Sequence, residues 1–223
     1  LVERRRAALD KFRAMPIPQE REEDWRYTDI SRLDLDNLEI RKPECKFNSP
    51  FVVSINSVDP EILNKYLLSM NIKKDKLLLL HEAMLSNGAF VRIPANETAT
   101  VSTQLTQGLG NHTIIILEPN SSLNFVEEYV PGGTGELNTS VTEIYAGMDS
   151  IVNFFSFQNL FKNVYDFSYK FASLGRNARI NWTFGCFGGR LSRIKTETLF
   201  NGEGSSSEWI GAFLGDDKRH IDL

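Results

Sequence analysis

Hydrophobic residues recur at helical spacing along the first 88 residues of the chain. Leu9 and Phe12 fall on one face of a first helix, which Pro16 must end because proline lacks an amide hydrogen and clashes with the preceding turn. A second helix begins at Pro60, with the preceding aspartate as its N-cap, and runs to Asn71. Its apolar positions are Ile62, Leu63, Tyr66, Leu67 and Met70.

A third helix and a strand complete this part of the chain. The spacing from Asp75 to Leu85 predicts a short helix ending at Asn87-Gly88, a residue pair suited to the left-handed conformation beyond a helix end. The apolar run Phe51 to Ile55 predicts a buried strand. We therefore expect residues 1–88 to form a small mixed α/β region.

From Ala89 onward, strands rich in β-branched and aromatic residues alternate with turns of Gly, Asn, Asp and Ser. In the run Ile180 to Cys186, every second residue is apolar, so these residues share one face of a strand. The run Phe167 to Phe171 alternates in the same way, which predicts aromatic residues on the core face and Ser168 and Lys170 on the other. Residues 89–223 are therefore expected to be mainly β.

A repeat runs through these strands. Turn residues separated by 28, 28 and 27 positions are Pro119, Gly147, Gly175 and Gly202. After each turn comes a polar residue followed by an aromatic one, at Asn124-Phe125, Asn153-Phe154, Asn181-Trp182 and Glu208-Trp209. Each period holds two strands, such as 151–157 and 165–172. This regularity favours a β-helix, in which stacked coils supply one another's core and hydrogen bonds.

An antiparallel sandwich is the alternative fold, because it also contains short strands between turns. A sandwich gives no reason for the same turn and the same polar-aromatic pair to recur, so the solenoid is preferred. The sequence stops at the start of another strand, His220 to Leu223, with no capping element. We expect residues 89–223 to be the first half of a longer β-helix, whose open edge favours self-association, including a homodimer.

Composition and charge narrow the classes of function. The formal net charge is −4, which disfavours binding to nucleic acid or anionic membranes. No apolar run approaches the ~20 residues of a membrane helix. Two cysteines and three histidines, all far apart in sequence, offer no disulfide framework and no metal-ligand spacing. These features are typical of a cytoplasmic protein.

Candidate chemistry is sparse. No Walker, GxSxG, HExxH or paired CxxC motif occurs. Cys186 lies on an apolar strand face and is expected to be a buried packing thiol, whereas Cys45 is expected to be exposed. His220 and Asp222 share a strand face and could contribute to a metal site, although an interface pair is favoured; His81 and His112 look ordinary. We assign no catalytic, cofactor-binding or metal-binding residue.

Three stretches resemble the SufB/SufD family of iron-sulfur cluster assembly, and SufD more closely than SufB. The first is Pro16-Ile17-Pro18 with Arg21 to Asp29, which contains Trp25-Arg26-Tyr27-Thr28. The second is Ala83 to Pro94. The third begins with Gly188-Gly189-Arg190-Leu191-Ser192-Arg193, includes Leu199 to Gly204, and ends at His220-Ile221-Asp222, similar to the family's GGxLxR, LxGEG and HxD patterns.

The resemblance implies a right-handed β-helix and a scaffold or accessory role beside a SufC-like ATPase and a SufB-like subunit. Many SufB members have a cysteine, implicated in receiving sulfur, where this chain has Thr198. The family's later coils, with their cysteine and histidine segment and SufC-binding helices, have no counterpart before Leu223. No functional residue of the family is therefore carried over, no cofactor is expected on this segment, and iron or an iron-sulfur cluster is expected only in the full complex.

Two other functions are alternatives to a scaffold of iron-sulfur assembly. A carbohydrate-active β-helix enzyme needs clustered carboxylates and exposed rings, and the repeat offers Glu127, Glu128, Glu143 and Glu197 without coil-to-coil alignment. A purely structural adhesion solenoid fits poorly with the cysteine usage and the helical N-terminal region. We therefore expect a non-enzymatic subunit of iron-sulfur assembly.

Overall fold

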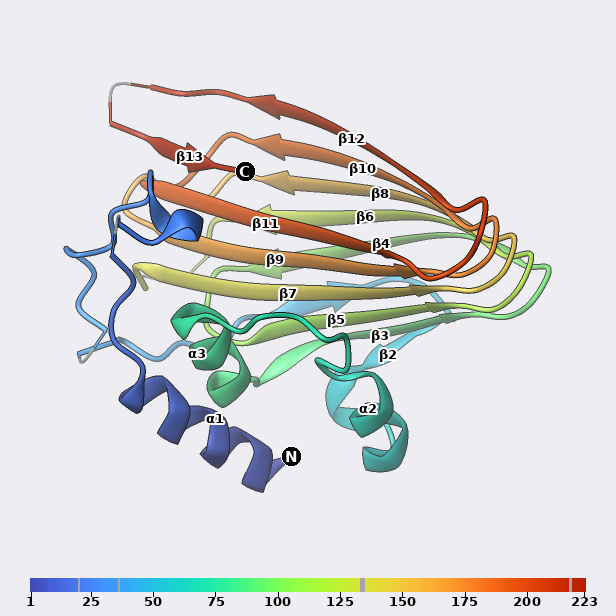
Figure 1. Cartoon of the computed structure of the whole chain (residues 1–223), viewed down its shortest axis with the longest axis horizontal. Coiled ribbons are helices and arrows are strands. Elements are labelled where there is room, and N and C mark those ends of the chain that lie inside the picture. The colour runs from blue at the N-terminus through green and yellow to red at the C-terminus, as the bar shows by residue number, and fades with distance from the viewer. Residues whose placement is uncertain (20, 36, 133–134, 217) are drawn as a thin grey trace.

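Two parallel sheets stack their strands into a β-helix (Figure 1). The computed structural model describes residues 1–19, 21–35, 37–132, 135–216 and 218–223. The first sheet contains β4 (Thr98–Thr106), β6 (Ser122–Val130), β8 (Ile151–Gln158), β10 (Arg179–Cys186) and β12 (Ser206–Phe213). The second contains β3 (Asn87–Ile93), β5 (Asn111–Leu117), β7 (Leu137–Ala146), β9 (Tyr165–Leu174), β11 (Leu191–Phe200) and β13 (His220–Asp222). The chain alternates between the sheets from β4 to β13, which confirms the solenoid and not the sandwich.

The strand register confirms the repeat found in the sequence. Asn124, Asn153 and Asn181 are direct partners on neighbouring strands, and their side-chain amides form a ladder with bonds of 2.9 and 2.8 Å. Their aromatic neighbours point into the β-helix, where the ring centroids of Phe125 and Phe154 lie 5.5 Å apart. Trp182 contacts Phe154 at 5.0 Å. One polar ladder and one aromatic stack therefore hold successive coils in register.

The corner that follows the second sheet also repeats its backbone conformation. The left-handed region is occupied once per coil, with φ between 54° and 75°, at Asn96, Asn120, Asp149, Asn177 and Gly204. Asn, Asp and Gly tolerate this region better than other residues, so the corner sequence follows from its geometry. At the predicted turn residue Gly202, a Cβ atom would lie 2.0 Å from the backbone nitrogen of Arg176 on the coil below. The coils thus approach too closely there for any side chain.

The N-terminal region covers the outer face of the second sheet (Figure 1). Its helices are α1 (Val2–Ala14), α2 (Pro60–Tyr66) and α3 (Lys76–Met84), with the short 3₁₀ turns η1 (Glu23–Trp25) and η2 (Ile55–Ser57). Two short strands, β1 (Cys45–Phe47) and β2 (Val52–Ser54), pair antiparallel with β4 and β3. Helix α1 packs on α3, and no described helix is long and apolar enough to cross a membrane.

This cover reverses one prediction about strand faces. On β9, Phe167, Tyr169 and Phe171 are buried against the N-terminal region, outside the β-helix, while Lys170 points into the interior. The predicted alternation of apolar and polar residues on β9 is confirmed. The prediction that the aromatic face is the one packed inside the β-helix is wrong. A strand covered on both sides has two buried faces, and period-2 alternation alone does not say which one is interior.

The helix starts were predicted correctly, and one helix end was not. Asp59 caps α2 as expected, but the helix ends at Tyr66 instead of Asn71 because Leu68 adopts a positive φ of 47°. Helix α1 ends at Ala14, before Pro16, and α3 ends at Met84, next to the predicted Leu85, although the expected stop pair Asn87-Gly88 belongs to β3. The end of α2 is set by a contact with the β-helix, which helical periodicity does not encode.

Candidate functional site

Three separated stretches of sequence meet beside the last coil. Arg193 of β11 donates from Nε to Asp222 Oδ2 of β13 at 3.0 Å, and the Thr28 hydroxyl donates to the same carboxylate oxygen. A second guanidinium nitrogen of Arg193 donates to the backbone carbonyl of Asp24 at 2.6 Å. Thr28 and Asp222 are 194 residues apart in sequence. These charge-assisted bonds tie the N-terminal segment to two neighbouring strands of the β-helix.

The indole of Trp25 completes this contact. Its ring lies under the Arg193 guanidinium, with 4.3 Å between the guanidinium carbon and the ring centroid, and packs against Phe167 at 6.2 Å. Trp25 is 2% exposed, whereas Tyr27 is 76% exposed, so only the tryptophan is an anchor. We call the set Trp25, Thr28, Arg193 and Asp222 the motif clasp.

The motif clasp also reaches helix α3. Asp75 Oδ1 accepts the Leu78 amide at 2.9 Å as the N-cap, and it accepts the Tyr169 hydroxyl at 2.7 Å. Asp75 Oδ2 lies 4.0 Å from an Arg193 guanidinium nitrogen. One carboxylate therefore starts a helix and fixes that helix against β9 and β11.

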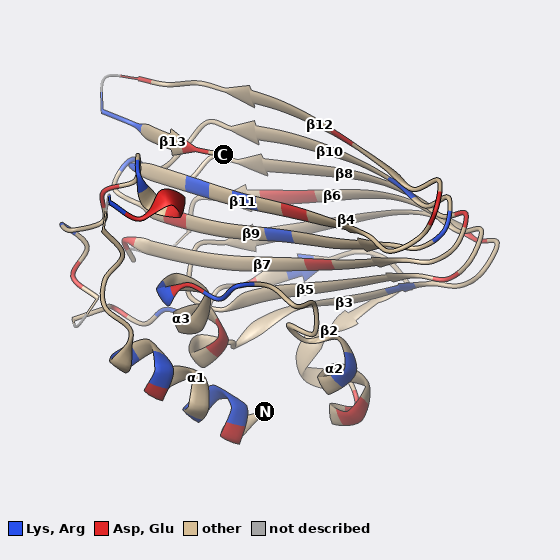
Figure 2. Cartoon of the chain, in the orientation of Figure 1, with Lys and Arg blue, Asp and Glu red and all other residues tan. Residues whose placement is uncertain are grey.

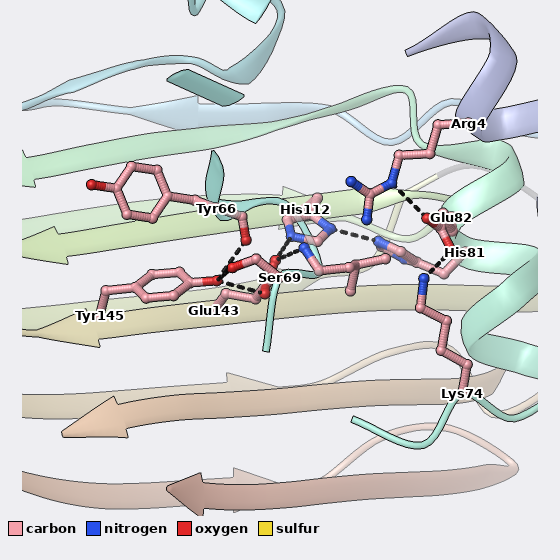
Figure 3. A network of polar contacts seen from close by, with 10 residues as sticks. Arg4, Tyr66, Ser69, Lys74, His81, Glu82, His112, Glu143 and Tyr145 are labelled. Carbon is pink, nitrogen blue, oxygen red and sulfur yellow. Dashed lines mark hydrogen bonds and ion pairs between the residues drawn. The ribbon is translucent and has the colours of Figure 1, made fainter. Parts of the chain in front are cut away.

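A second polar cluster is buried under α3 (Figure 3). His81 Nε2 lies 3.0 Å from His112 Nδ1, and His112 Nε2 lies 2.9 Å from Glu143 Oε2. Since a carboxylate only accepts, His112 donates to Glu143, and His81 then donates to His112. All three side chains are fully buried. We call this chain of hydrogen bonds the His–His–Glu line.

The line continues to the loop after α2. Glu143 Oε2 accepts the Leu68 amide at 2.6 Å, and this bond holds Leu68 in its left-handed conformation. The Tyr145 hydroxyl lies 3.1 Å from Glu143 Oε1 and 2.5 Å from the Tyr66 carbonyl oxygen. Burial and the nearby Glu143 carboxylate raise the pKa of Tyr145, so its hydroxyl stays protonated at neutral pH. The line therefore fastens both α2 and α3 to the second sheet.

Acidification should weaken this fastening. Burial, reinforced by His112, holds the pKa of His81 well below 6.5, so the folded protein takes up this proton less readily than the unfolded chain. Stability from His81 is complete above pH 6.5 and declines as the pH falls below it, by at most about 1.4 kcal/mol per pH unit. We expect the free energy of unfolding, measured with urea, to fall more steeply with decreasing pH below 6.5 in the protein than in His81→Gln. Above pH 7 the two curves should differ by a constant amount. Parallel curves throughout would contradict the prediction.

A third polar cluster lies inside the β-helix. The Lys170 ammonium pairs with Glu127, and both side chains are 1% exposed. Glu127 also accepts the Ser156 hydroxyl at 2.9 Å and the Thr142 hydroxyl at 3.1 Å. The Tyr129 hydroxyl lies 3.4 Å from the ammonium. The remaining lone pairs of the carboxylate are thus satisfied, which a buried ion pair requires.

Asp166 forms a neighbouring cluster. It accepts Asn138 Nδ2 at 2.7 Å and the Ser168 hydroxyl at 3.1 Å, and Gln158 connects it to Ser192. Burial raises the pKa of Asp166 to about 6 despite these bonds. The interior of the β-helix therefore holds, beside its apolar core, a group of polar side chains that bond one another.

Comparison with known proteins identifies the family. The family described as SUF system FeS cluster assembly, SufBD core domain, matches residues 98–223, which is every strand from β4 to β13. The chain belongs to the SufBD family. The matched segment contains Arg193 and Asp222, and the motif clasp joins this SufBD core domain to the N-terminal region.

Curated relatives carry the same name. The chain is 26% identical to the iron-sulfur cluster assembly protein SufD of Bacillus subtilis over 70% of its own length and 38% of the relative's. It is 27% identical to SufBD family proteins of Staphylococcus epidermidis and Staphylococcus haemolyticus, again over 70% of this chain and 36% of each relative. The chain thus spans less than two-fifths of the length of these relatives.

The carboxylates considered for a carbohydrate enzyme lie apart in this SufBD protein. Glu127 is inside the β-helix, and Glu143 is buried on the opposite side of the second sheet. Glu128 accepts from Gln104 at 3.1 Å, and Glu197 pairs with Lys195 at 2.8 Å. The four do not form one acidic groove.

The two cysteines have packing roles. Cys186 is buried as predicted, but Cys45 is half-buried against the core instead of exposed. Burial raises the pKa of Cys45 to about 12 and that of Cys186 to about 11, so neither is a thiolate at neutral pH. Asp222 is used by the motif clasp, and the described residues hold no cluster of three His, Cys, Asp or Glu arranged for a metal ion.

Sequence reasoning missed the His–His–Glu line and the interior clusters. A signal was present for the strand residues, because His112 and Glu143 are 31 residues apart, close to one coil, whereas His81 lies on α3 and has no such signal. Asn138 and Asp166, and likewise Thr142 and Lys170, are 28 residues apart. In a solenoid, polar residues one period apart lie on neighbouring strands.

Proposed function

We propose that this protein is a SufD-like scaffold or accessory subunit of a SUF-type iron-sulfur cluster assembly complex, and not an enzyme. The observation that carries the proposal is the match of the SufBD core family to every strand from β4 to β13. The polar clusters support it, because the ionisable side chains of the motif clasp and the interior are consumed in mutual bonds. A scaffold needs such fixed geometry more than it needs an open pocket.

The proposed partners are a SufC-like ATPase and a SufB-like subunit, and a homodimer is a further possible assembly. The relatives named SufD and SufBD are iron-sulfur cluster assembly proteins, and the matching family is described as part of the SUF system. Iron and sulfur are cargo of the complex in this proposal, and this segment binds no resident cofactor.

We further propose a cytoplasmic location and a division of the chain into a 1–88 region and a 89–223 β-helix. The low cysteine count and the protonated thiols are compatible with a reducing compartment. The motif clasp would then be the joint through which the N-terminal region and the β-helix act as one unit.

Affinity purification tests the proposal. The complete open reading frame, tagged and expressed in its source cell beside a differently tagged copy, should recover a SufC-like ATPase and a SufB-like chain, identified by mass spectrometry. Recovery of the second tag would support the homodimer.

Recovery of neither partner would count against the scaffold proposal. If the purified protein then depolymerised a polysaccharide panel, the carbohydrate-active alternative would replace it.

A further inference from the structure

A basic hollow lies where the connections into β9, β11 and β13 meet the N-terminal segment. It has a volume of about 960 Å³, within the range of small-molecule sites. Among the described residues, its charged lining consists of Arg32, Lys162, Arg190, Lys218, Arg219 and one carboxylate, Asp216. Figure 2 shows Lys and Arg segments on the connection leading into β13 and beside the start of β11. This concentration of positive charge contrasts with the net charge of −4 of the whole chain.

Two of the five cations are already used. Arg219 donates to the carbonyl oxygens of Gly189 and Leu214 at 3.2 and 2.5 Å, and it lies 3.6 Å from Asp216. Lys162 also pairs with Asp216, at 3.2 Å. The two carbonyl contacts fix Arg219 at the edge of the hollow, and the ion pairs with Lys162 and Arg219 offset the charge of Asp216.

The other three cations have no ion-pair partner among the described residues. Arg32, Arg190 and Lys218 come from three different segments and line both this hollow and an adjoining one of about 370 Å³. Arg190 rests on the Tyr165 ring, with 5.3 Å between the guanidinium carbon and the ring centroid. Asp29 also lines the adjoining hollow, where the Ser31 amide at 2.8 Å and the nearby Arg32 lower the pKa of its carboxyl. Three cations thus converge beside one carboxylate among the described residues, and the charge of this surface stays positive.

The backbone fixes the position of Arg190. A Cβ atom on Gly188 would lie 2.1 Å from the Leu160 nitrogen, and Gly189 has a φ of 83°. The Gly188 amide donates to Gln158 Oε1 at 2.8 Å, and the Arg190 amide donates to the Val164 carbonyl at 2.7 Å. The two glycines therefore form a tight corner that delivers the arginine to the rim of the hollow.

A polar atom in the adjoining hollow also lacks a partner. His220 lines that hollow, and its Nε2 atom is buried without a hydrogen bond to any described residue. The exposed ring of Tyr27 lies on the same rim. Residues of the family-like stretches that the motif clasp leaves unused, Tyr27, Arg190 and His220, therefore line this surface.

We propose that the basic hollow binds a small molecule carrying a diphosphate or triphosphate group. Such a group places several negative charges within reach of three cations at once, and the planar guanidinium groups of Arg32 and Arg190 match the geometry of phosphate oxygens. An acidic peptide spreads single charges along its length and fits three cations around one compact hollow less well.

Titration calorimetry with pyrophosphate tests this site. The protein should bind one pyrophosphate saturably and bind inorganic phosphate more weakly. Arg190→Gln and Lys218→Gln should each weaken binding by at least about tenfold, the loss expected for one charge-assisted hydrogen bond. Lys218 is exposed, and substitutions of exposed residues usually change stability little, so this variant keeps the test independent of folding.

Arg179→Gln is the matched control. Arg179 is exposed at the start of β10, whereas the hollow lies beyond the end of this strand. Its replacement changes the net charge by the same amount as the other two substitutions, and binding should be unaffected. Absence of saturable binding, or equal weakening in all three variants, would overturn the site. A glutamate-rich peptide that binds as tightly as pyrophosphate, with the same sensitivity to Arg190 and Lys218, would overturn the phosphate assignment in favour of an acidic protein segment.

Discussion

Replacing Lys170 with methionine is expected to lower the free energy of unfolding by about 3–5 kcal/mol. The substitution removes the ammonium but leaves Glu127 ionised in the interior of the β-helix, where its side chain is 1% exposed. Ser156 and Thr142 still donate to the carboxylate, but two neutral donors do not replace a full opposite charge. Chemical denaturation of the two proteins at pH 7 measures the difference.

The double variant Lys170→Met/Glu127→Met supplies the control. It removes both charges and fills similar volume with apolar atoms, so it should regain at least half of the lost stability. A double variant as unstable as the single one would mean that packing, and not the unpaired carboxylate, causes the loss. A single variant with unchanged stability would contradict the assignment of a buried ion pair.

Replacing Trp25 with alanine is expected to cost about 3–5 kcal/mol, the range for truncating a buried tryptophan. The indole is 2% exposed and supports the Arg193 guanidinium on its face. Its loss leaves a cavity beside Phe167 and weakens the motif clasp. Hydrogen exchange should accelerate in residues 21–33 before the β-helix strands are affected, because the segment is tied down mainly through this clasp.

Tyr27→Ala is the control from the same stretch. Its side chain is 76% exposed, so stability should change by less than about 0.5 kcal/mol. Similar losses for Trp25→Ala and Tyr27→Ala would contradict the view that one aromatic residue anchors the segment and the other remains in solvent. An unchanged exchange rate in residues 21–33 would do the same for the motif clasp.

Trp25 is buried and Tyr27 is exposed, although both lie in the same family-like stretch, so such a motif is hard to interpret from sequence alone. Arg193, Thr28 and Asp222 lie in stretches that resemble one family, but the sequence does not indicate that they share one carboxylate. Their meeting depends on how the N-terminal segment crosses the second sheet. That path is decided by burial of Trp25 against Phe167, and neither residue signals its partner locally.

The β-helix, its period and its corners follow from local features of the sequence. The reason is that each coil repeats the same local requirement: a residue that tolerates positive φ, such as Asn120 or Asp149, followed by a polar and then an inward aromatic residue. Helix starts at Pro60 and Lys76 were equally local, because an N-cap aspartate precedes each. The end of α2 was not local, since Leu68 turns where Glu143 accepts its amide.

Which strand faces are interior, and which polar side chains bond one another, depends on the tertiary structure and not on local sequence. The N-terminal region covers the second sheet, so Phe171 is buried outside the β-helix and Lys170 inside it. The His–His–Glu line joins a helix to two neighbouring strands, and the basic hollow joins four segments. Local pattern records which residues alternate, whereas the partner across a layer depends on how layers stack, and that stacking is a property of the whole chain.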